Sequence, residues 1–74
     1  GSDVEIVYNG SYLQFVTSAE ILDVTVFDVA GRVVMRANDG KNTLHVGSAG
    51  LINGLYIVKV ATSAGSAAKQ IVVK

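Results

Sequence analysis

Few side chains in this sequence have the types and spacing that acid–base, nucleophilic or metal chemistry needs. The single histidine, His45, lies in a short alternating run, and its position relative to Leu44 and Val46 directs it towards solvent. Acid–base catalysis requires carboxyl groups that converge in a cleft, and a metal site requires a cluster of ligands. The carboxylates are spread along the chain at Asp3, Glu5, Glu20, Asp23, Asp28 and Asp39. We therefore expect no enzyme activity, no cofactor and no metal.

The stretch 47–54 is the glycine-rich loop of the chain. A phosphate-binding loop of this composition leads into the N-terminus of a helix, usually through a Gly-Lys-Ser/Thr sequence. Here a strand-like run at 54–62 follows instead. We interpret the loop as a connection between strands.

The composition is that of one small globular domain. The chain has 74 residues, of which 50% are hydrophobic and 16% charged, a balance that disordered chains do not have. It contains no cysteine, and six acidic residues balance six basic ones. The basic residues are scattered, at Arg32, Arg36, Lys41, Lys59, Lys69 and Lys74. Because binding to phosphates needs clustered cations, we expect no nucleic-acid partner. We interpret Gly1–Ser2 as the remnant of a cleaved tag and residues 3–74 as the domain.

The elements that would position these side chains are all strands. Proline is absent, and no segment keeps a helical period over the length that a helix needs. Short runs rich in β-branched and aromatic residues are instead separated by Gly, Asn, Asp and Ser. The predicted strands are 4–8, 11–17, 22–28, 32–37, 43–46, 54–62 and 67–73. This spacing indicates an all-β sandwich or barrel.

Asn9–Gly10 predicts the first hairpin. Both residue types tolerate positive φ, which a two-residue hairpin loop requires. Such a loop would pair Ile6 with Leu13 and Val4 with Phe15 on one face.

The second predicted turn is 28–31, where Asp at the first position and Gly at the fourth favour a three-residue loop between strands 22–28 and 32–37. This pairing distributes apolar residues over both faces. One face would carry Val24, Val26 and Val34, and the other Phe27, Val33 and Met35. Since a half-exposed strand needs only one apolar face, we expect the second face to be covered by a loop or by a partner.

The third turn lies around 63–66. A three-residue loop would set Lys59 opposite Lys69, an unfavourable pair of like charges. We therefore favour a four-residue loop, which sets Lys59 beside Gln70. One face then carries Tyr56, Val58, Val60, Ile71 and Val73.

Three segments of the chain carry motifs in a fixed order. The first is 24–34, a strand, Asp28, two variable residues, Gly31, a basic residue and another strand. The second is 51–60, which contains the Gly54-x-Tyr56 sequence, and the third is 69–74, after a glycine-centred turn. Together these segments closely resemble the C-terminal sorting domain of proteins exported by the bacterial type IX (Por) secretion system. Where the family usually has a proline before the second strand, this chain has Ile52.

The resemblance implies an immunoglobulin-like β-sandwich of about seven antiparallel strands and a sorting signal. Its partners would be the outer-membrane translocon and shuttle proteins, followed by a surface sortase. The domain would pass through the periplasm to the outer membrane, the cell surface or the medium. The residues that match the recognition signal are Gly54, Tyr56, Lys69, Ile71, Val72, Val73 and Lys74. Asp28 and Gly31 match the turn motif and are expected to be structural.

The last predicted strand also has the properties of an edge that a partner could extend, since it has no proline and few charges. We therefore expect the isolated domain to dimerise or to swap a strand. The alternative function is an immunoglobulin- or fibronectin-like binding or adhesion module, with Tyr12 as its best outward aromatic residue.

Overall fold

The computed structural model describes residues 4–38, 40, 42–47 and 50–74. The interpretation of Gly1–Ser2 as a tag remnant, and the carboxylates Asp3 and Asp39, lie outside this part. Within the described residues seven strands form, as predicted, with ends within two residues of the expected ones. They are β1 (Glu5–Tyr8), β2 (Tyr12–Val16), β3 (Ile21–Asp28), β4 (Val33–Ala37), β5 (Thr43–His45), β6 (Gly54–Thr62) and β7 (Gly65–Val73). No helix among the described residues is long and apolar enough to cross a membrane.

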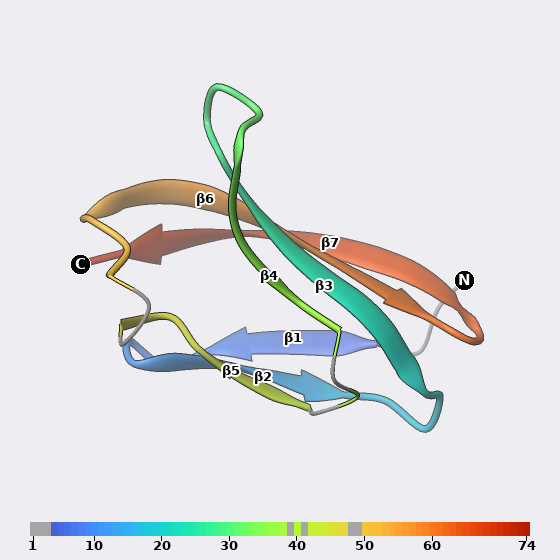
Figure 1. Cartoon of the computed structure of the whole chain (residues 1–74). Helices are drawn as coiled ribbons and strands as arrows, with labels where there is room; N and C mark the ends of the chain where they lie inside the picture. Colours follow the sequence, from blue (N-terminus) through green and yellow to red (C-terminus); the bar gives the residue numbers. More distant parts are fainter. Residues whose placement is uncertain (1–3, 39, 41, 48–49) are drawn as a thin grey trace.

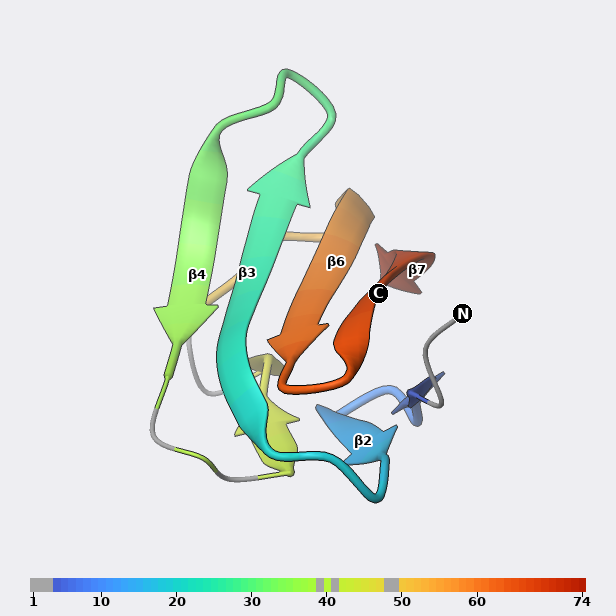
Figure 2. The ribbon, with the colours of Figure 1, turned by 90° about the vertical axis from the view of Figure 1, so that its right-hand side faces the viewer.

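The strands form two antiparallel sheets that stack as a sandwich. One sheet has the order β1-β2-β5 and the other β4-β3-β6-β7. Figure 1 shows the smaller sheet lying below the larger one. Figure 2 shows the larger sheet with β4 at one edge and β7 at the other. The predicted all-β, immunoglobulin-like sandwich is confirmed.

The core fills the space between the sheets. The smaller sheet and the segment after β5 contribute Ile6, Leu13, Phe15 and Val46. The larger sheet contributes Ile21, Val24, Val26, Tyr56, Val58, Val60, Ile71 and Val73. Within each strand these residues mostly alternate with exposed ones, because successive side chains point to opposite faces of a sheet. Fully burying one such side chain is worth about 1.5–3 kcal/mol.

The β1–β2 hairpin has the predicted faces but a different register. Ile6 lies opposite Phe15 and Tyr8 opposite Leu13, so the predicted pairing of Ile6 with Leu13 and of Val4 with Phe15 is wrong. The loop is longer because Asn9 organises it: its side-chain oxygen accepts hydrogen bonds from the backbone N–H groups of residues 11 and 12, both at 3.0 Å. A side chain that caps its own turn in this way favours a wider loop.

The β3–β4 turn has the predicted three-residue loop, and Asp28 N donates to the Arg32 carbonyl at 2.9 Å. Beyond it the register shifts, because Val34 is an extra residue between the pairs Phe27–Val33 and Val26–Met35. Met35 therefore lies opposite Val26 and packs against the core. The prediction that Met35 shares the face of Phe27 and Val33 is wrong.

The β6–β7 hairpin is tighter than predicted. Thr62 pairs with Gly65 across a two-residue loop, so the predicted four-residue loop is wrong. Ala68, not Gln70, lies opposite Lys59. The Thr62 hydroxyl accepts a hydrogen bond from Ala64 N at 3.1 Å and donates one to the Gly65 carbonyl at 2.8 Å, which closes the short loop. The slip is of two residues, so the predicted inward face is preserved.

Candidate functional site

The residues that match the sorting signal form two groups, one buried in the core and one exposed at the surface. Tyr56, Ile71 and Val73 belong to the core, and each residue exposes only 4–5% of its surface. Gly54, Lys69, Val72 and Lys74 are exposed. The two groups lie in one strand pair, in which Gly54 is opposite Val73 and Tyr56 is opposite Ile71.

Tyr56 connects this strand pair to the loop that precedes it. Its ring is buried, and its hydroxyl donates a hydrogen bond to the carbonyl of Ile52 at 2.7 Å. A tyrosine at such a position supplies apolar area through its ring and holds a polar partner through its hydroxyl. Across the sheet, Tyr56 lies opposite Asp28 of β3. The 24–34 motif, which contains Asp28, and the Gly54-x-Tyr56 motif are therefore neighbours in the fold, although they are distant in the sequence.

Asp28 holds the turn between β3 and β4. Its Oδ1 accepts hydrogen bonds from the backbone N–H groups of Ala30 at 2.9 Å and Arg32 at 3.0 Å. Its Oδ2 accepts one from Arg32 Nε at 3.0 Å. The backbone N–H of Arg32 is the main cause of a lowered pKa of the Asp28 carboxyl. Gly31, with φ of 85°, takes the left-handed conformation that lets the turn close.

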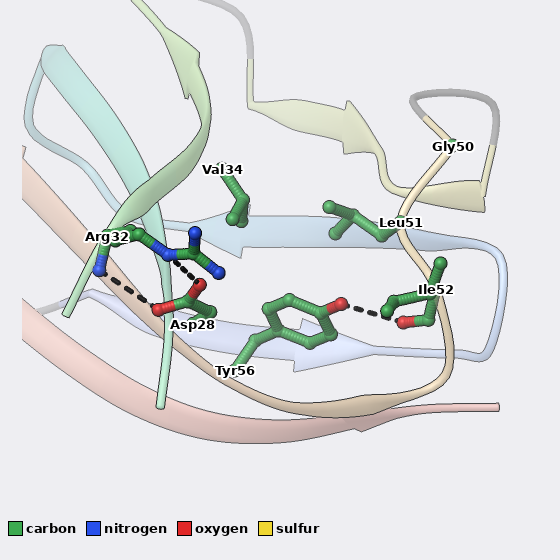
Figure 3. A pocket seen from close by; sticks show the side chains of 7 residues that line it. All are labelled: Asp28, Arg32, Val34, Gly50, Leu51, Ile52 and Tyr56. Atoms are coloured by element: carbon green, nitrogen blue, oxygen red, sulfur yellow. Dashed lines mark hydrogen bonds and ion pairs between the residues drawn. The ribbon is translucent and has the colours of Figure 1, made fainter. Parts of the chain in front are cut away.

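An open cleft of about 370 Å³ lies between this turn and the segment before β6 (Figure 3). It is lined by Asp28, Arg32, Val34, Gly50, Leu51, Ile52 and Tyr56. In Figure 3 the end of the Arg32 side chain points towards the space between Val34 and the Tyr56 ring. The cleft thus combines apolar walls with one guanidinium group.

Asp28 and Tyr56 belong to motifs that are recognisable in the sequence, whereas the other five lining residues are not predicted as site residues. Arg32 is the basic residue of the 24–34 motif, and Ile52 lies just before the Gly54-x-Tyr56 sequence, so a neighbouring motif points to each of these two residues. Val34, Gly50 and Leu51 carry no such signal, because a bulge and a long-range approach of two loops bring them to the cleft.

Lys69 links the two sheets. It lies opposite Val58 on the inward-facing side of β7, and its Nζ donates a hydrogen bond to the carbonyl of Ile6 in β1 at 2.8 Å. Figure 2 shows β7 on the side of the larger sheet where the N-terminal strand also lies. Lys69 therefore ties the edge strand of one sheet to the edge strand of the other.

The outer face of the larger sheet carries an apolar strip. We define it as Phe27, Val33, Leu55, Ile57 and Val72, which lie opposite or next to one another across the strands. Val33 is 54% exposed, Val72 50% and Leu55 37%. No loop among the described residues covers these side chains, so the other predicted alternative, that this face meets a partner, stays a prediction.

His45 points outward, as predicted, while Val46 is fully buried. Its ring lies beside Tyr12 on the outer face of the smaller sheet, with a centroid distance of 5.4 Å. The residues that the structure describes contain no group of three His, Cys, Asp or Glu side chains that could hold a metal ion.

Comparison with known families gives one match that spans almost the whole chain. A family model described as the secretion system C-terminal sorting domain matches residues 3–74. No curated protein matches the chain.

Proposed function

The chain belongs to the family of secretion system C-terminal sorting domains, and from this premise we propose that it directs an attached cargo protein across the outer membrane through the type IX secretion system, for attachment at the cell surface. The observation that carries the proposal is the family match over residues 3–74. The partners are then the outer-membrane translocon and its shuttle proteins, met from the periplasmic side. A surface sortase acts after translocation.

Burial assigns different roles to the members of the signal. A side chain with 4–5% exposure, such as Tyr56, Ile71 or Val73, has almost no surface to offer to a partner of the folded domain. Recognition of the folded domain then depends on exposed residues of the same strand pair, above all Val72 and Lys74. The buried residues hold β7 in place.

A reporter fusion tests the proposal. We expect residues 3–74, fused to the C-terminus of a periplasmic reporter, to bring the reporter to the surface of a type IX-competent strain. Val72→Asp should leave most of the reporter in the periplasm, because it places a charge on the recognised strand. Leu22→Asp is the matched control, since both residues are 50% exposed and Leu22 lies on β3. Cell fractionation and surface labelling measure the distribution.

The same experiment reports on the sortase. If the sortase removes the domain at the surface, the surface reporter is lighter than the periplasmic fusion by the mass of residues 3–74, a little less than the 7.7 kDa of the 74-residue chain. Any glycolipid joined to the reporter adds to its mass. Surface display that persists in a strain without the translocon would contradict the proposed function. Export that survives deletion of residues 69–74 would contradict the role of β7.

A further inference from the structure

We propose that the cleft between the β3–β4 turn and segment 50–52 binds an extended peptide of a partner protein, with an apolar side chain inside the cleft and a neighbouring carboxylate on Arg32. This binding site goes beyond the sorting function. Four features of the described residues support it: the apolar walls, the direction of the Arg32 guanidinium, the hydrogen bonds that already occupy both oxygens of Asp28, and the strand beside the cleft.

The walls favour an apolar group. Val34, Leu51, Ile52 and the Tyr56 ring provide most of the lining, and Val34 and Ile52 are 39% and 78% exposed. Exposed apolar surface in a concave site is covered favourably by an apolar side chain of a ligand. The hydrogen bond from the Tyr56 hydroxyl to the Ile52 carbonyl keeps the two walls together at 2.7 Å.

Arg32 supplies the charge complementarity. Its Nε is held by Asp28 at 3.0 Å, while neither of its terminal Nη groups has a hydrogen-bond partner among the described residues. These Nη groups point into the cleft (Figure 3). A guanidinium that is oriented through Nε presents its two Nη groups as a fork, and this fork matches the two oxygens of a carboxylate.

Asp28 does not compete for the same position. Both of its oxygens already accept hydrogen bonds, Oδ1 from two backbone N–H groups and Oδ2 from Arg32 Nε. The Asp28 carboxylate therefore binds the guanidinium of Arg32 at Nε. The Nη side of the guanidinium, which is positively charged, faces the cleft. Because Arg32 is the only cation among the described residues that line the cleft, a ligand with one carboxylate fits better than a phosphate, which needs several donors.

The neighbouring strand favours a peptide over a free small molecule. β4 is the edge of its sheet, and Val34, the extra residue of the bulge, lies in both the strand and the cleft lining. An extended peptide that pairs with the unpaired side of an edge strand gains main-chain hydrogen bonds. Its alternate side chains then reach the pocket beside the strand.

A titration of the whole 74-residue chain, labelled with ¹⁵N, tests the proposal. The probe is the blocked peptide acetyl-Thr-Val-Asp-Leu-Thr-amide, and its neutral analogue carries Asn in place of Asp. We expect the acidic peptide to shift the amide signals of Arg32, Val34 and Leu51. The neutral analogue should bind about tenfold more weakly, because it cannot form the charged pair with the fork.

Two matched arginine variants locate the effect. Arg32→Gln should abolish the preference for the acidic peptide. Arg36→Gln should keep it, although Arg36 lies on β4, which begins directly after Arg32, and also bonds an aspartate, Asp23, through Nε at 3.4 Å. Signals outside residues 28–34 report whether Arg32→Gln leaves the fold intact, and Arg32→Lys, which keeps the charge without the fork, should retain part of the preference.

Three results would overturn the proposal: no shift at the cleft with millimolar peptide, equal binding of the two peptides, or equal loss in both glutamine variants. All are measured in vitro without the secretion machinery. Failure of peptide binding is therefore distinct from failure of export in the reporter experiment.

Discussion

At the residue scale, Asp28 shows how one ionised side chain shapes a turn. Its carboxylate accepts three hydrogen bonds within five residues of chain, from Ala30 N, Arg32 N and Arg32 Nε. These donors favour the charged form, so the pKa of Asp28 in the folded protein lies below its ordinary value of 3.8. The stability of the domain must therefore depend on the ionisation of this group.

The first prediction concerns acid pH. Since the pKa of Asp28 is lower in the folded than in the unfolded chain, its ionisation stabilises the fold fully above pH 3.8, and this contribution is lost as pH falls through the folded value. Asp28→Asn keeps an acceptor oxygen for the turn but cannot ionise. We expect the stability difference between wild type and variant, measured by urea unfolding, to shrink below pH 3.8. A difference that is constant with pH would contradict this.

The second prediction concerns the Tyr56 hydroxyl. Tyr56→Phe keeps the buried ring and removes the hydrogen bond of 2.7 Å to the Ile52 carbonyl. We expect the free energy of unfolding to fall by about 1 kcal/mol, the usual net value of such a bond. Amide exchange in segment 50–53 should become faster. Tyr12→Phe is the control, since Tyr12 lies on the outer face of the smaller sheet. If both variants lose equal stability, the Tyr56 bond has no special role.

At the element scale, the contact of Lys69 with Ile6 joins two edge strands that belong to different sheets. The third prediction is that Lys69→Met, which keeps the apolar stem, lowers the free energy of unfolding by about 1 kcal/mol. Hydrogen bonds from charged groups are worth more than this, but the exposure of Lys69 reduces the gain. Denaturant unfolding measures the change, and amide exchange in β1 should rise with it.

Lys59→Met is the matched control for this prediction. Lys59 is exposed on the outer face of β6 and makes no hydrogen bond or ion pair within the described part of the chain. Its replacement should change the stability by less than about 0.5 kcal/mol. Equal losses for the two lysines would show that Lys69 acts through its general charge and not through β1.

The alternation of side chains predicts the strands and their faces, but not their registers. Ile6, Leu13 and Phe15 share the inward face whichever even slip the hairpin adopts, so the pattern cannot choose between pairings. The choice is made by the side-chain hydrogen bonds of Asn9 and Thr62 to nearby backbone groups. Such bonds depend on local geometry that residue types alone do not determine.

The candidate site was only partly predictable for a related reason. Asp28 and Tyr56 carry recognisable sequence patterns, yet nothing in either pattern places them side by side. Their neighbourhood follows from the pairing of β3 with β6, which are separated by β4 and β5 in the chain. Val34 reaches the cleft through a bulge, and a bulge leaves no clear signature in the alternation.

At the scale of the whole molecule, Lys69 closes one side of the sandwich by linking β7 to β1. The outer face of the larger sheet is apolar at one end. The apolar strip runs over β4, β3, β6 and β7, and beyond it the same face carries Thr25, Arg36 and Lys59. Such a face is uncommon in monomers unless it meets a partner. The strip reaches the edge strand β7 at Val72.

The last prediction is that the isolated domain self-associates through this edge. β7 has nine residues, no proline, and Lys69 as its only charge, and Lys69 is turned towards β1. Natural edge strands usually carry charges or proline that prevent pairing with another chain, so this edge is poorly protected. We expect the weight-average mass in sedimentation equilibrium to rise above 7.7 kDa with concentration.

Val72→Lys places a charge at the edge and should restore the monomer. Leu22→Lys, at the same 50% exposure, should not. A wild-type domain that stays at 7.7 kDa up to millimolar concentration would show that the strip and the edge do not bind a second copy.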